Sequence, residues 1–327
     1  LNDWTLKING TEKVLTADEA SAQLDGFNIT PTGATIIVPG FEPLDDHGDT
    51  MLPFAQVIRN EAESVAGNSW LFDYDHARGG FHASQSVLPT PAQQDASGEI
   101  VLLFDWSLAS RQVSEGWAES SGDALFSMLV DLELVDPATG SGVPLHVIGA
   151  GMGASVASEA VERLGYFDVD VDHLTYLDPH DFDQGLVYDS AQDFDSLAQL
   201  PGYGVAVWDN VDFADVYYQT RATNGPDLSD SLVPAGRPIP GAYNYWLNDS
   251  TSQLPDSPYD ELNIFGDHEY VWAGFYLSTI NGETPQANET AALTKDTPAP
   301  ENAIDPNETG YVYSRLKSGE LNRPDPQ

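Results

Sequence analysis

Short apolar runs alternate along the chain with segments in which apolar residues recur at helical spacing. Six apolar runs predict buried strands, at residues 34–38, 70–74, 100–104, 145–148, 173–177 and 205–208. Three segments with helical spacing predict helices, at residues 51–66, 117–132 and 155–164. Alternation over 4–16, on both sides of Asn9-Gly10, predicts a hairpin. Strands that alternate with helices predict an α/β fold, with a mostly parallel sheet covered by helices on both faces.

The later part of the chain has weaker patterns. Residues 222–260 are rich in Pro, Gly, Asp and Ser, which predicts surface loops. We expect one domain over 1–282. A Pro-rich extension over 283–327 is expected to pack on this domain or to be partly disordered.

The charge balance and the residue types narrow the classes of function. The chain has 12 Lys+Arg against 52 Asp+Glu, so its formal net charge is −40. Binding to nucleic acid or to an anionic membrane surface needs cationic patches, for which this chain has few residues. The absence of cysteine excludes disulfides, thiolate catalysis and zinc–cysteine sites. No run of 18 apolar residues is present, so we expect no transmembrane segment.

Such acidity suits a protein that works in salty water, where hydrated carboxylates maintain solubility and salt screens their repulsion. We therefore expect a secreted, extracellular protein of bacterial or halophilic origin. The cytosol of an organism that accumulates salt is the alternative.

The glycine-rich segment 149–154 (GAGMGA) follows a predicted strand and precedes a predicted helix, and it fits two chemistries. Gly149, Gly151 and Ala154 match the G-x-G-x-x-G/A pattern of NAD- or FAD-binding oxidoreductases, in which a pyrophosphate binds at the helix N-terminus. The context of this match is poor. The strand is about the fifth rather than the first, and the next strand ends at Asp178, farther away than the expected ribose-binding acid.

The second interpretation is the nucleophile elbow, G-x-S-x-G, in which a sharp turn exposes the central side chain. Gly149 and Gly153 match the two flanking glycines. The central residue is Gly151, which tolerates the strained turn but has no oxygen with which to attack a carbonyl.

The order of motifs favours the elbow. After it come Leu177-Asp178-Pro179, at the end of a predicted strand, and later His268, which is the order of nucleophile, acid and histidine in α/β-hydrolases. Upstream, the strand that ends in Pro39-Gly40-Phe41 resembles the lipase strand that ends in His-Gly-Phe. The stretch from about 34 to 280 therefore resembles a bacterial lipase-like α/β-hydrolase.

This resemblance implies a role for each matching position. Gly151 would occupy the nucleophile position, Asp178 would orient the histidine, and His268 would act as the general base. Asp209, at the end of the predicted strand 205–208, is the alternative acid.

The backbone amides of Phe41 and Met152 would form the oxyanion hole. Two departures from the family pattern matter: Pro39 replaces the usual histidine, and Ala150-Gly151-Met152 replaces a segment centred on serine.

Three explanations remain for the missing serine: natural loss in a pseudo-hydrolase, another nucleophile, or a serine altered in the sequence as given. Natural loss is favoured because the neighbours Ala150 and Met152 are also unusual. Ser155 is the nearest serine, but it lies about one turn into the helix, where it is expected to cap or pack.

Acidic runs raise the question of calcium. They lie at 45–49, 168–172 and 178–183, and none matches a twelve-residue calcium loop. Each is more typical of a solvated face. We expect no required cofactor, with one bound calcium as an open alternative.

The leading hypothesis is a lipase- or esterase-like protein with weak or no activity, whose ligand is a lipid or other small-molecule ester. The second is a non-catalytic extracellular binding module, part of a larger protein, that uses the vestigial pocket or acidic calcium sites. The third is an oxidoreductase that binds NAD or FAD at 149–151.

Overall fold

The computed structural model describes residues 3–8, 11–16, 29–40, 51–74, 81–83, 96–106, 115–179, 204–219, 236–247, 268, 270–282 and 308–326. Eight strands form the main sheet: β3 (Thr30–Val38), β4 (Ser69–Tyr74), β5 (Phe81–Ala83), β6 (Ser97–Leu103), β9 (Leu145–Ala150), β10 (His173–Leu177), β11 (Ala214–Tyr218) and β12 (Tyr243–Trp246). Two short antiparallel pairs stand outside it, namely β1 (Asp3–Ile8) with β2 (Thr11–Thr16) and β7 (Val135–Asp136) with β8 (Ser141–Gly142).

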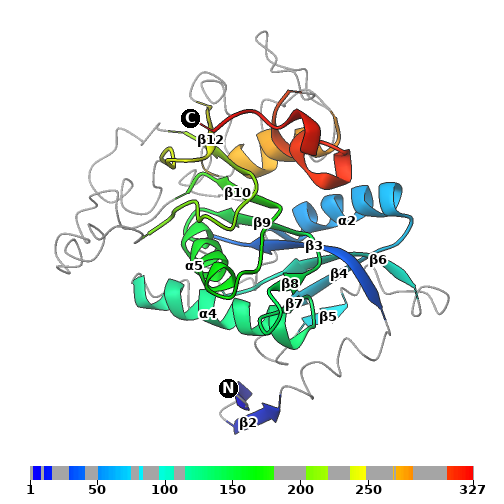
Figure 1. Cartoon of the computed structure of the whole chain (residues 1–327), viewed down its shortest axis with the longest axis vertical. Coiled ribbons are helices and arrows are strands. Elements are labelled where there is room, and N and C mark those ends of the chain that lie inside the picture. Colours follow the sequence, from blue (N-terminus) through cyan, green and yellow to red (C-terminus); the bar gives the residue numbers. More distant parts are fainter. Residues whose placement is uncertain are drawn as a thin grey trace, which may run out of the picture.

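The order of the strands in the main sheet is β12-β11-β10-β9-β3-β6-β4-β5 (Figure 1). All neighbours pair in parallel except β5, which is antiparallel to β4. Strands β9 and β10 lie in the middle, and all of their residues are buried. Burial on both faces explains the apolar residues at successive positions, such as Val147 and Ile148, although His146, His173 and Thr175 are buried polar residues in the same strands.

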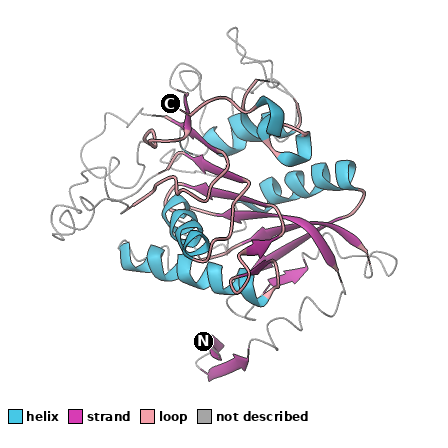
Figure 2. Cartoon of the chain, viewed as in Figure 1, coloured by secondary structure: helices cyan, strands magenta, loops and turns pink. Residues whose placement is uncertain are grey.

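Helices cover both faces of the sheet (Figure 2). One face carries α4 (Glu115–Asp131) and α5 (Gly153–Tyr166). The other carries α2 (Leu52–Ala66), a π-helix η5 (Tyr270–Tyr276) and the short α10 (Leu277–Ile280). The predicted α/β architecture is thereby confirmed.

Neighbouring residues of β3 show how each strand serves two cores. Ile36 packs in the core under α4 and α5, and Ile37 packs in the core under α2 and η5. Successive side chains of a strand point to opposite faces of the sheet. A strand between two helical layers therefore needs apolar residues on both faces.

One predicted strand is wrong. Residues 205–208 form no strand, and the strand lies instead at β11, further along the chain. The segment 205–208 is held by a side chain of α5: Ser158 Oγ accepts hydrogen bonds from the Ala206 amide and from Trp208 Nε1, both at 3.1 Å. The buried Asp215 interrupts the apolar pattern of β11, which is why that strand is inconspicuous in the sequence.

The loops predicted at 222–260 also need correction, because β12 lies within them and extends the sheet beyond β11. The predicted hairpin is present as β1 and β2, whose register pairs Trp4 with Leu15.

Residues 308–326, which we call the C-terminal strap, form three short 3₁₀ helices: η6 (Gly310–Tyr313), η7 (Arg315–Lys317) and η8 (Glu320–Asn322). Tyr311 and Leu316 are buried in the same core as α2 and α10. Among the described residues, three ion pairs join the strap to the body of the protein: Arg315 with Glu99, Lys317 with Glu61, and Arg323 with Asp172. The boundary predicted after residue 282 stays a prediction.

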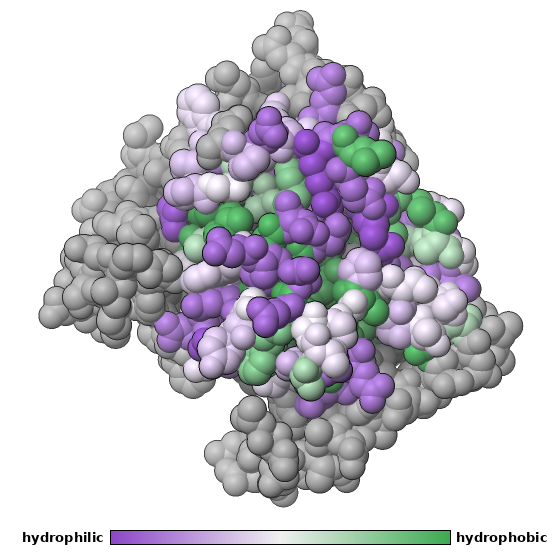
Figure 3. Space-filling model, in the orientation of Figure 1, coloured by the Kyte–Doolittle hydropathy of each residue, from purple (hydrophilic) through white to green (hydrophobic). Residues whose placement is uncertain are grey.

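On the face seen in Figure 3, hydrophilic and intermediate residues predominate, and hydrophobic residues occur in small separate groups. Among the helices in the described ranges, none has the length and apolar character needed to cross a bilayer.

Candidate active site

The turn between β9 and α5 has the geometry of an elbow. Its central residue, Gly151, has φ +52°, a left-handed conformation that a side chain adopts only with strain. The Gly151 amide donates a hydrogen bond of 2.9 Å to the Leu177 carbonyl of β10. The turn is therefore fixed to the neighbouring strand at the carboxyl ends of the sheet, where ligands bind in folds of this class.

The flanking glycines allow strand and helix to approach closely. A Cβ on Gly149 would lie 2.7 Å from the Cα of Ala154. A Cβ on Gly153 would lie 2.3 Å from two backbone carbonyl oxygens, those of Val38 and Pro39. Neither position has room for a side chain, which is the physical reason for the spacing of the two glycines in the sequence.

Asp178, which directly follows β10, is fully buried and held by four donors. Its Oδ1 accepts the backbone amides of Gln219 at 3.0 Å and Gly236 at 3.1 Å. Its Oδ2 accepts Gln219 Nε2 at 2.9 Å and lies 2.8 Å from His268 Nδ1. A Cβ on Gly236 would lie 2.2 Å from Oδ1, so only glycine lets this amide come so close.

Asp178 itself has φ +51°. A non-glycine residue in this region is strained by about 1–2 kcal/mol, and such strain persists only where the surroundings impose it. The four hydrogen bonds impose it here and aim the carboxylate at His268.

The hydrogen-bond pattern also fixes the tautomer of His268. A carboxylate that accepts three N–H donors is an acceptor toward the imidazole as well, so Nδ1 carries the hydrogen. The other ring nitrogen, Nε2, then carries the lone pair of the neutral ring. The His268 side chain is 13% exposed, so the ring is not fully closed off from solvent.

The ring of His268 lies against the elbow. A Cβ built on Gly151 would be 2.9 Å from both Nε2 and Cε1 of His268, and 3.7 Å from the Cα of Gly40. The structure thus brings together three predicted positions that are far apart in sequence: Gly151, Asp178 and His268. The imidazole edge fills the place where a side chain at 151 would begin.

The predicted oxyanion hole is described in part. Met152 is buried and immediately precedes α5, so its amide belongs to the first turn of that helix. Phe41 lies outside the described residues. The preceding Pro39 is fixed by Trp106, whose Nε1 donates to the Pro39 carbonyl at 2.7 Å. A Cβ on Gly40 would lie 3.1 Å from the Ala150 carbonyl, so the end of β3 lies beside the elbow.

Asp209 is not part of this constellation. It is exposed, and it lies in a turn that precedes β11 instead of following a strand. The expectation that it ends a strand is wrong for the reason given above for 205–208. Sequence reasoning missed Gln219 and Gly236, because neither matches a motif and their role depends on a contact with Asp178.

The acidic run 168–172 shows no calcium geometry. Asp168 and Asp170 are exposed, and Asp172 accepts two hydrogen bonds from the guanidinium of Arg323, at 3.0 and 3.2 Å. Within the described ranges, no three acidic or histidine side chains are grouped as a metal site would need. The run 45–49 and residues 180–183 lie outside the described residues, and calcium binding stays an untested expectation.

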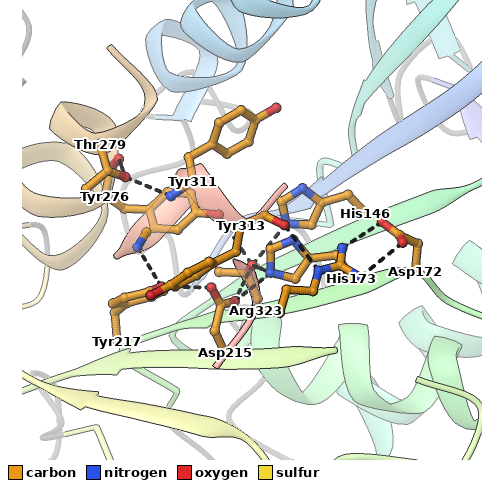
Figure 4. Close-up of polar contacts among 12 residues, drawn as sticks. His146, Asp172, His173, Asp215, Tyr217, Tyr276, Thr279, Tyr311, Tyr313 and Arg323 are labelled. Carbon is orange, nitrogen blue, oxygen red and sulfur yellow. Dashed lines mark hydrogen bonds and ion pairs between the residues drawn. The ribbon is translucent and has the colours of Figure 1, made fainter. Parts of the chain in front are cut away.

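A second set of polar side chains extends along β9, β10 and β11 from their amino ends, and no motif in the sequence predicted it. This amino-end cluster consists of His146, His173, Thr175, Asp215 and Tyr217 (Figure 4). Asp215 accepts hydrogen bonds from Thr175 Oγ1 at 2.6 Å and Tyr217 OH at 2.8 Å, and it lies 3.0 Å from His173 Nε2. The rings of His146 and His173 stack with centroids 4.0 Å apart.

The strap covers this cluster. The Gly310 amide donates to Tyr217 OH at 2.8 Å, and the ring of Tyr311 stacks on His146. Burial, followed by electrostatic interactions with His173, Arg323 and Arg315, lowers the pKa of His146 well below its ordinary value.

A mostly parallel sheet, helices on both faces and a glycine elbow between a central strand and its helix define an α/β-hydrolase fold. Comparison with known proteins adds little to this assignment. No protein-family model matches the chain, and no curated protein matches it. A crystal structure of "the putative cell surface hydrolase from Lactobacillus plantarum WCFS1" is similar at 14% sequence identity, over 58% of this chain and 68% of that chain, with a TM-score of 0.30. So weak a likeness indicates nothing about function, and the fold class rests on the sheet and the elbow.

Proposed function

We propose that the chain is a lipase- or esterase-like member of the α/β-hydrolase fold, in which a site for esters is retained but the nucleophile is lost. The observation that carries this proposal is the contact of His268 with two partners: Asp178 at Nδ1, and the elbow at Gly151 on its opposite edge. This is the arrangement in which a histidine takes a proton from a nucleophile and an acid fixes its orientation.

The same observation predicts weak ester hydrolysis. Removing the nucleophile from a triad costs on the order of 10⁶ in turnover, although hydrogen bonds to the oxyanion can remain. Gly151 has no hydroxyl, so ester hydrolysis in the chain as written is expected to be weak or absent.

The dinucleotide hypothesis has less support in the geometry. In a dinucleotide site the second glycine of the fingerprint lets the backbone approach the pyrophosphate. Here that glycine is Gly151, and the place of its missing side chain faces the imidazole of His268. A preparation that shows no saturable binding of NAD or FAD would agree with this interpretation.

An extracellular location in salty surroundings also belongs to this proposal. Its support is the net charge of −40 together with the absence of cysteine. The non-catalytic binding module is the alternative, and a melting temperature that rises with calcium and falls with a chelator would favour it.

The experiment that tests the proposal compares Gly151→Ser with Gly151→Ala. Both variants place a Cβ at the same strained position, at a cost of about 1–2 kcal/mol, and both require the ring of His268 to shift by a few tenths of an ångström. Only the serine variant adds an oxygen. Hydrolysis of p-nitrophenyl esters is expected to rise about 10²-fold or more in Gly151→Ser over Gly151→Ala, and to fall again when His268→Gln is added.

Circular dichroism and a melting curve establish that each variant is folded. A folded Gly151→Ser variant that is no more active than Gly151→Ala would overturn the proposed function.

A further inference from the structure

Among the described residues beside the elbow, and in the absence of a hydroxyl at 151, the group that can react with a carbonyl is the imidazole of His268. Its Nε2 lies 2.9 Å from the place that the Cβ of a nucleophile would occupy. In an intact triad the hydroxyl would stand between this nitrogen and the substrate. With glycine at 151, nothing of that side chain separates them.

The lone pair of Nε2 is also prepared for attack. Nδ1 is held by Asp178, and Asp178 is held in turn by three amide donors from Gln219 and Gly236. The ring therefore cannot change its tautomer without losing a buried hydrogen bond. Positive charge that develops on the ring during an attack lies next to the carboxylate, which stabilises it.

We propose that His268 is itself the nucleophile of a residual acyl-transfer activity toward esters with good leaving groups, such as aryl esters of short acids. This inference rests on the proposed function, because it needs the ester carbonyl to bind beside the elbow. Alkyl esters are expected to be inert, since an alkoxide leaves much less readily than imidazole from the tetrahedral intermediate.

The reaction has two stages. In the first, Nε2 forms a bond to the carbonyl carbon, and the carbonyl electron pair moves to oxygen beside the Met152 amide. The bond to the aryloxide then breaks, and the aryloxide leaves with its electron pair. The product is an acyl-imidazolium whose Nδ1–H stays bonded to Asp178.

In the second stage a water molecule adds to the acyl carbon, and the bond to Nε2 breaks with its electron pair returning to the ring. The products are the carboxylic acid and the original imidazole. The proton released from the water neutralises the aryloxide, so the sum is the hydrolysis of one ester by one water.

Direct attack accounts for the geometry better than activation of a water by the same nitrogen. A water would have to fit between the imidazole and the acyl carbon, whereas the ring edge already touches the elbow. A carbonyl held by the Met152 amide would therefore meet Nε2 without an intervening atom.

The experiment treats the unaltered chain with p-nitrophenyl acetate, quenches it within one turnover in cold denaturant at neutral pH, where a neutral acetylimidazole is hydrolysed more slowly than in acid, and locates the acetyl group by peptide mass spectrometry after a brief digestion. The expected result is one acetyl group on the peptide that contains His268, with none on the peptides of the other six histidines. Hydroxylamine added before the quench should convert this acetyl group into acetohydroxamate. His268→Gln should lower the release of p-nitrophenolate by about tenfold or more.

The outcomes separate the two proposals. If the release of p-nitrophenolate depends on His268 but leaves no acetyl group there, the histidine activates water. This result would overturn the inference and leave the proposed function in place. An unchanged release of p-nitrophenolate in a folded His268→Gln variant would overturn the inference as well. If Gly151→Ser also shows no gain over Gly151→Ala, the proposed function fails together with the inference.

Discussion

The described residues include two aspartate–histidine pairs, whose aspartates lie at the end of β10 and on the neighbouring β11, and the surroundings of the two pairs differ. At the carboxyl ends, Asp178 holds Nδ1 of His268, and the opposite edge of the ring faces the elbow. At the amino ends, Asp215 holds Nε2 of His173, and both side chains are fully buried. The free ring nitrogen of His173, Nδ1, has no hydrogen-bond partner among the described residues.

The difference lies in what covers each pair. The strap and the stacked ring of His146 close the amino-end cluster, so no substrate reaches His173. The ring of His268 is partly exposed and touches a glycine whose side chain is missing. A carboxylate–imidazole contact therefore indicates catalysis only where the other nitrogen meets an open position; elsewhere it is part of the core.

The largest expected effect separates the pairs by activity. In the Gly151→Ser background, Asp178→Asn removes the charge that supports the imidazolium and supplies a competing donor, so turnover of p-nitrophenyl esters should fall by about 10⁴. Asp215→Asn in the same background should leave turnover per folded molecule unchanged. Equal losses in the two variants would remove the distinction between the pairs.

Asp215→Ala should show that the amino-end pair contributes to the stability of the fold. It leaves Thr175, His173 and Tyr217 without a buried acceptor. Loss of one partner of a buried ionic network costs about 3–5 kcal/mol, which urea denaturation measures as a lower midpoint at an unchanged slope. A loss under about 1 kcal/mol would show that the cluster contributes little to the fold.

Acid should destabilise the protein through His146. Its pKa is lowered in the folded state, so below the ordinary value of 6.5 the unfolded chain takes up a proton that the folded chain refuses. The free energy of unfolding should therefore fall by about 1.4 kcal/mol for each pH unit below that value, until the folded pKa is reached.

His146→Gln keeps a donor toward Thr175 and removes the titrating group, so it should flatten this slope. The relevant quantity is the difference in slope between the two proteins. Glu99, whose pKa burial raises, acts in the opposite direction in both of them. Parallel stability curves for the two proteins would contradict this prediction.

The smallest effect concerns the strap. Arg323 makes two hydrogen bonds to Asp172 and lies over the ring of Phe213, with its guanidinium carbon 5.2 Å from the ring centroid. Arg323→Met should cost about 1–2 kcal/mol, and Lys317→Met, which loses one partly exposed ion pair, less than about 1 kcal/mol. A smaller loss of stability in Arg323→Met than in Lys317→Met would mean that the strap is held by its apolar residues alone.

The sequence allowed more of the fold to be predicted than of the site. Apolar runs identify central strands such as β3 and β6 because those strands are buried on both faces. They fail at β11, where Asp215 belongs to a buried network that local pattern does not reveal. Residues 205–208 led to a wrong prediction for the opposite reason: the run is apolar, but it forms no strand.

In the site, the two glycines beside the elbow and the order of Asp178 and His268 were visible in the sequence, because a sharp turn and a strand end constrain residue type locally. Gln219 and Gly236 were not visible. Their contribution is a hydrogen bond to a carboxylate more than 40 positions away, which no local signal encodes.

The most direct test of the central claim uses a fluorophosphonate, which phosphonylates a serine only when a histidine–acid pair activates it beside an oxyanion hole. We predict that Gly151→Ser takes up one phosphonyl group at position 151, and that adding His268→Gln abolishes this labelling. A folded Gly151→Ser protein that stays unlabelled, or that labels equally well without the histidine, would contradict the account.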